Sequence, residues 1–64
     1  METKNANICN YAESLLSLAN EIKGRCGLLG DSYDENQAII KIIDIYMTAI
    51  ESQRIILQTA LDEY

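Results

Sequence analysis

The 64-residue sequence contains no proline, tryptophan, phenylalanine or histidine, and it has only three glycines. Without proline, nothing in the chain forbids long helices, and a composition rich in Ile, Leu, Ala, Glu and Gln favours them. Strands would need alternating apolar and polar residues with turn signals at intervals of roughly ten residues, and the sequence lacks both. The sequence therefore predicts an all-α protein.

The lack of histidine also limits the chemistry that the chain can perform. Carboxylate-bridged metal sites in helical bundles use a Glu-x-x-His motif, which this chain cannot supply. Asp31, Tyr33 and Glu35 alternate as calcium ligands do, but the glycine and the final glutamate of a calcium loop are missing. No nucleophile is paired with a base, and no strand leads into a glycine-rich phosphate loop. We expect no catalytic residue, metal or cofactor, and hence a non-enzymatic protein.

Long apolar runs and export signals are missing as well. The densest apolar stretch, residues 39–49, is interrupted by Lys41, Asp44 and Thr48, so it falls short of the roughly 18 apolar residues that span a membrane. The N-terminus lacks the basic and then apolar segments of a signal peptide. With two cysteines and no export signal, we expect a cytoplasmic protein without membrane association.

In the first half of the sequence, apolar residues recur at alternating spacings of four and three, the repeat of a coiled-coil seam. This repeat predicts a first helix over about residues 5–29. A stop near Lys23 is the alternative, because each interior glycine costs about 1 kcal/mol relative to alanine and Gly24 and Gly27 lie in the last turns. The continuing repeat favours the longer helix. The predicted seam residues are Ile8, Ala12, Leu15, Ala19, Ile22, Cys26 and Leu29.

A polar break follows, with a predicted turn at about residues 30–32. Gly30 is suited to the left-handed conformation that ends many helices. Ser32 and Glu35 form the S-x-x-E capping box that begins the next helix. We therefore expect a second helix over about residues 33–62. Its predicted seam residues are Ile39, Ile43, Tyr46, Ile50, Leu57 and Leu61.

The apolar arc of the second helix is unusually wide. At about 100° per residue it spans roughly 200°, whereas packing against one partner needs a stripe of about 100°. Two helices joined by a tight turn can cover only one side of each other, and large exposed apolar patches indicate an interface. The sequence thus predicts an antiparallel two-helix hairpin, a single domain over 1–64, that dimerises into a four-helix bundle. The ROP type of hairpin dimer is an architectural analogy.

The two cysteines have different expected environments. On one helix they lie about 25 Å apart, too far for a disulfide within the chain. Cys26 is predicted to be a small buried residue of the seam. Cys9 lies at its edge, with an intermolecular disulfide or a reactive thiol as the alternative to a structural role. In the second seam, Gln53 and Arg54 replace apolar residues, either to fix the register or with the Arg54 stem along the apolar surface.

The surplus apolar surface favours a protein-binding role. We expect a small regulator, inhibitor or adaptor that acts as a homodimeric bundle, with the size and acidity of an accessory product of a phage or mobile element. The alternative is that the same residues only hold the homodimer together. The candidate partner surface comprises Ile42, Ile45, Ala49, Ile56, Ile55 and Tyr33.

Nucleic-acid binding is the alternative from a different class. The basic residues are scattered, and a net charge of −5 opposes contact with phosphates. A dimer can still gather the bases of two first helices on one face, so an RNA- or DNA-binding bundle similar to the ROP type stays open. A helical subunit of a larger complex is the third possibility. The basic residues are Lys4, Lys23, Arg25, Lys41 and Arg54.

Overall fold

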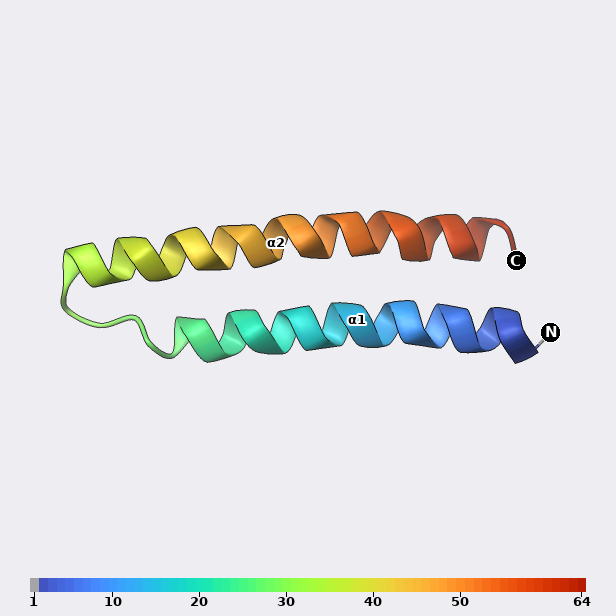
Figure 1. Ribbon diagram of the computed structural model, residues 1–64, viewed down its shortest axis with the longest axis horizontal. Helices are drawn as coiled ribbons and strands as arrows, with labels where there is room; N and C mark the ends of the chain where they lie inside the picture. Colours follow the sequence, from blue (N-terminus) through green and yellow to red (C-terminus); the bar gives the residue numbers. More distant parts are fainter. Residues whose placement is uncertain (1) are drawn as a thin grey trace.

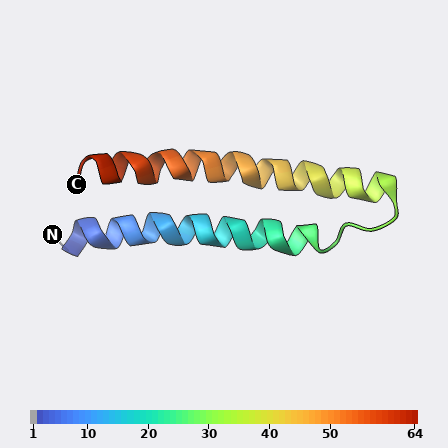
Figure 2. The same ribbon diagram turned by 180° about the vertical axis from the view of Figure 1, so that it is seen from behind.

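The computed structural model describes residues 2–64, with side chains from residue 5 onward, and it forms an antiparallel helical hairpin (Figure 1). Helix α1 spans Glu2–Cys26 and helix α2 spans Tyr33–Asp62. The two helices lie side by side in a single layer, and both ends of the chain lie at the same end of the hairpin (Figure 2). The predicted all-α hairpin is confirmed, and its extents are 51 × 15 × 10 Å.

The start of α2 follows from its capping residues. Ser32 is the N-cap, with an extended backbone, and its hydroxyl oxygen accepts a hydrogen bond from the Glu35 amide at 3.4 Å. Asp34 and Glu35 place negative charge in the first turn, where the helix dipole favours it. The helix therefore begins at the residue that the capping motif indicated, and α2 covers the expected range.

The end of α1 differs from the sequence-based prediction. The helix continues through Gly24 but ends at Cys26, three residues before the predicted Leu29. Beyond it, the Leu28 amide donates to the Arg25 carbonyl at 3.0 Å and the Leu29 amide to the Cys26 carbonyl at 3.3 Å. These i to i+3 bonds close the helix with a tighter final turn that satisfies carbonyls left without helical partners. The turn is correspondingly longer than predicted, and it covers residues 27–32.

The expected left-handed conformation of Gly30 is wrong, because no glycine among residues 2–64 has a positive φ. A side chain holds this glycine instead. The Asn36 amide nitrogen donates to the Gly30 carbonyl at 2.8 Å, and the Asn36 oxygen accepts from the Gly30 amide at 3.0 Å. Both polar groups of the Gly30 backbone are thereby satisfied. Asn36 thus ties the turn to the first turns of α2.

The helices meet along residues spaced alternately three and four apart, which is the spacing of a coiled-coil interface. Ile43 is the only buried side chain among residues 5–64, with 9% of its surface exposed. On α1, the half-buried residues are Ile8, Tyr11, Leu15, Leu18, Ile22 and Arg25. On α2, they are Asn36, Gln37, Ile39, Tyr46, Ala49, Ile50, Gln53, Leu57 and Ala60.

The predicted seam of the first helix is therefore only partly right. On α1, Ile8, Leu15 and Ile22 recur every seven residues. Each is followed by one candidate interface residue three positions later and by another four positions later, and the repeat fits both candidates equally well. The structure turns the first set, Tyr11, Leu18 and Arg25, toward α2, since these long side chains remove more apolar surface from water than alanines do. The predicted seam residues left exposed are Ala12, Ala19, Cys26, Leu29 and Leu61. The prediction that Cys26 is buried is accordingly wrong.

Polar contacts fix the register of the two helices near both ends of α1. The Arg25 guanidinium lies 4.8 Å from the centre of the Tyr46 ring, close enough for a cation–π contact. Arg25 is held there by Glu21, whose carboxylate lies 2.7 Å from its Nη1. At the open end of the hairpin, the Tyr64 hydroxyl donates a hydrogen bond to the Asn5 side chain. These contacts set which levels of α1 and α2 lie opposite each other.

Candidate protein-binding surface

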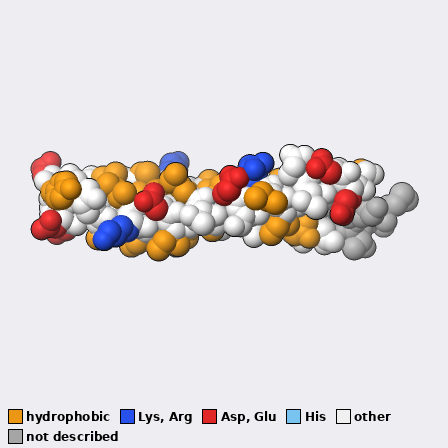
Figure 3. Space-filling model, turned by 90° about the horizontal axis from the view of Figure 1, so that it is seen from above, with side chains coloured by type: hydrophobic (Ala, Val, Ile, Leu, Met, Phe, Trp, Pro, Cys, Tyr) orange, Lys and Arg blue, Asp and Glu red, His pale blue; other side chains and the backbone are white. Residues whose placement is uncertain are grey.

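The hairpin leaves much of its apolar side-chain surface uncovered. Among residues 5–64, twelve large hydrophobic side chains are exposed, and in Figure 3 hydrophobic groups lie among acidic and basic ones along the visible face. The exposed residues are Leu16, Leu28, Leu29, Tyr33, Ile40, Ile42, Ile45, Met47, Ile55, Ile56, Leu61 and Tyr64. No helix among the described residues is both long and apolar enough to cross a membrane.

The accessible area gives this surplus a magnitude. The hairpin exposes 4960 Å², whereas a compact monomer of 7.2 kDa exposes about 4,100 Å². The excess is about 800 Å², which is the area that each partner contributes to a standard protein–protein interface. The radius of gyration, 15.1 Å, likewise exceeds the roughly 11 Å of a compact domain of this length. The elongated hairpin therefore exposes more total surface than a compact chain of the same size.

Seven of these twelve exposed residues fall on two opposite faces of the hairpin. One residue further along a helix lies about 100° further around its axis. Because the two helices are antiparallel, residues that directly follow an interface residue on either helix lie on the same face of the hairpin. One face thus carries the residues that directly follow the interface rows, and we name it the alanine face. It comprises Ala12, Ala19 and Cys26 with Cys9, Leu16 and Lys23 on α1, and Ile40, Met47, Arg54 and Leu61 with Asp44, Glu51 and Gln58 on α2.

The opposite face carries the residues that directly precede the interface rows. On α2 these include Ser52 and Thr59 as well as an apolar set that we name the isoleucine stripe: Ile42, Ala49 and Ile56, with Ile45 beside them. Ile45 is 68% exposed, whereas Ala49 is half-buried. The α1 side of this face is polar, with Asn7, Ser14 and Glu21. Only the isoleucine stripe could therefore offer an apolar docking surface here.

The two remaining residues of the predicted partner surface lie outside this stripe. Ile55 is 52% exposed on the outer side of α2, and Tyr33 is 74% exposed at the first position of that helix. The helical repeat separates Ile55 from Ile45 by about 80° around the axis. The structure thus brings four of the six predicted residues together and leaves these two apart.

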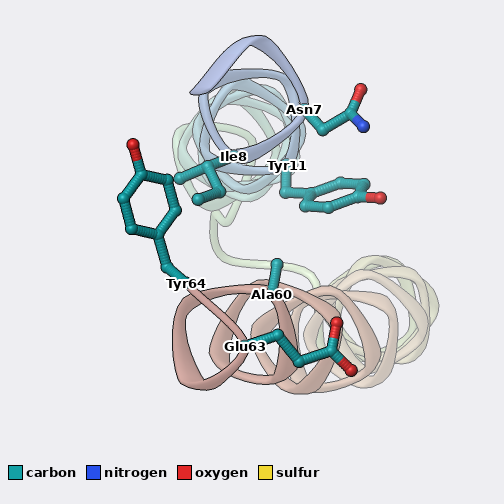
Figure 4. Close-up of a pocket in the computed structure, with 6 residues that line it drawn as sticks. All are labelled: Asn7, Ile8, Tyr11, Ala60, Glu63 and Tyr64. Carbon is teal, nitrogen blue, oxygen red and sulfur yellow. The ribbon is translucent and has the colours of Figure 1, made fainter. Parts of the chain in front are cut away.

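A cleft lies between the helices at the open end of the hairpin (Figure 4). Its volume is about 180 Å³, below the roughly 300 Å³ at which small-molecule pockets begin. In the figure, Ala60 lies between Ile8 and Tyr11, and Tyr64 lies on the opposite side from Glu63 and Tyr11. These side chains leave little room for a ligand.

Charged groups on the surface pair locally rather than gather. The Arg54 Nη2 lies 2.8 Å from Glu51 Oε1, and this hydrogen bond, with the charge of Arg54, lowers the pKa of the Glu51 carboxyl. The Glu51 carboxylate in turn raises the pKa of Arg54. Arg25 forms a second ion pair, with its Nη1 2.7 Å from Glu21 Oε2. The candidate basic residue Lys4 lies outside the residues whose side chains are described.

The two cysteines, Cys9 and Cys26, are both exposed on α1 and are not bridged to each other. Across residues 2–64, the structure contains no group of three His, Cys, Asp or Glu residues able to hold a metal ion. The exposed apolar faces are therefore the prominent candidate functional feature of the described chain.

Sequence reasoning missed Asn36, whose contact with Gly30 spans six residues. One signal in the sequence indicated that Asn36 holds the turn: it lies at the start of the 3–4 repeat of α2, next to the predicted turn. No family model, curated protein or solved structure matches the chain. The candidate surface is therefore argued from geometry and physical chemistry alone.

Proposed function

We propose that the chain is a small, non-enzymatic protein-binding regulator, inhibitor or adaptor that acts as a homodimeric helical bundle. The observation that carries the proposal is the contrast, among residues 5–64, between one buried side chain, Ile43, and twelve exposed large hydrophobic ones. Soluble monomers rarely expose apolar patches of this extent unless the patches are interaction sites.

Two apolar faces support two different contacts. The alanine face has apolar residues on both helices, as a four-helix bundle needs, with Asp44, Glu51 and Gln58 beside them on α2. The isoleucine stripe lies on α2 alone, which suits the edge of a partner such as a single amphipathic helix. One face can therefore serve self-association while the other binds a different protein.

The nucleic-acid alternative has less support. Two of the basic residues, Arg25 and Arg54, are paired with carboxylates of their own helix. Binding phosphates there would require those ion pairs to be exchanged, against a net charge of −5. A mobility-shift assay with RNA and with DNA at low salt tests this alternative, because phosphate binding would be retained at low salt and lost as salt rises.

The proposal is tested by affinity capture with Ile45→Glu and a control, Thr48→Glu, which places the same charge on the outer side of α2. Thr48 and Ile45 are both exposed positions of this helix. We expect the wild type and Thr48→Glu to retain one protein at a fixed ratio, and Ile45→Glu to lose it. Equal retention by all three chains, or no retained protein, would contradict the proposal.

A further inference from the structure

We draw no further inference here: the strongest candidate, the isoleucine stripe on α2 with the open groove that Ser14, Ser17 and Ala49 line beside it, is an apolar surface of the hairpin, and nothing in the structure shows what covers it.

Discussion

Ile43 and Ile42 provide a matched pair for testing the packing of the hairpin. They are neighbours in one helix, but Ile43 is 9% exposed and Ile42 41% exposed. Replacing either with alanine changes helix propensity equally, so the difference between the two variants isolates burial. A buried Ile→Ala substitution costs about 2–5 kcal/mol. In this single-layer hairpin neighbouring side chains can relax into the gap, so we expect about 2 kcal/mol for Ile43→Ala and less than about 1 for Ile42→Ala.

Thermal melts followed by circular dichroism measure this difference. At this chain length 1 kcal/mol corresponds to about 4–8 °C, so Ile43→Ala should melt about 8–16 °C below the wild type and clearly below Ile42→Ala. All three chains are compared at one protein concentration, because association stabilises the folded state by mass action. Equal losses in the two variants would refute the assignment of Ile43 to the interior.

Three further predictions concern the turn and the surface. A methyl group on Gly24 would meet no atom within 4 Å, so Gly24→Ala should raise stability by about 0.5–1 kcal/mol, and a lower melting temperature would count against the end assigned to α1. Asn36→Ala should cost about 1–2 kcal/mol through its two lost hydrogen bonds to Gly30, and Asn36→Asp, which keeps the acceptor, should cost less; equal melts of all three chains would show that the contact is unimportant. The pKa of Glu51 lies below its ordinary value because Arg54 stabilises the carboxylate, so its small stabilising effect is complete above that ordinary pKa and disappears as the pH falls through the lowered one. An NMR titration in which Arg54→Gln leaves the Glu51 pKa unchanged would contradict this cause.

Periodicity and capping predicted the hairpin well because both depend on local sequence. Ser32 and Glu35 form their hydrogen bond across three residues, and the start of α2 follows from it. The apolar repeat likewise placed Ile39, Ile43 and Ile50 in a single row, which the structure turns toward α1. A helix cap and an apolar row can be predicted from the sequence of one helix, without knowledge of the helix that packs against it.

The face that α1 turns toward α2 could not be predicted in the same way. Tyr11 and Ala12, like Leu18 and Ala19, both fit the 3–4 repeat, and the choice depends on how much area each buries against α2. The turn is a similar case. Gly30 is held by the distant side chain of Asn36, so its own conformational freedom did not decide its geometry.

Sedimentation equilibrium from micromolar to millimolar concentration tests the central claim most directly, because the claim is that one hairpin exposes more apolar surface than it can cover. Our account predicts a mass twice the 7.2 kDa of one chain, with dissociation only at the lowest concentrations. A single chain of 7.2 kDa that persists at millimolar concentration would contradict it.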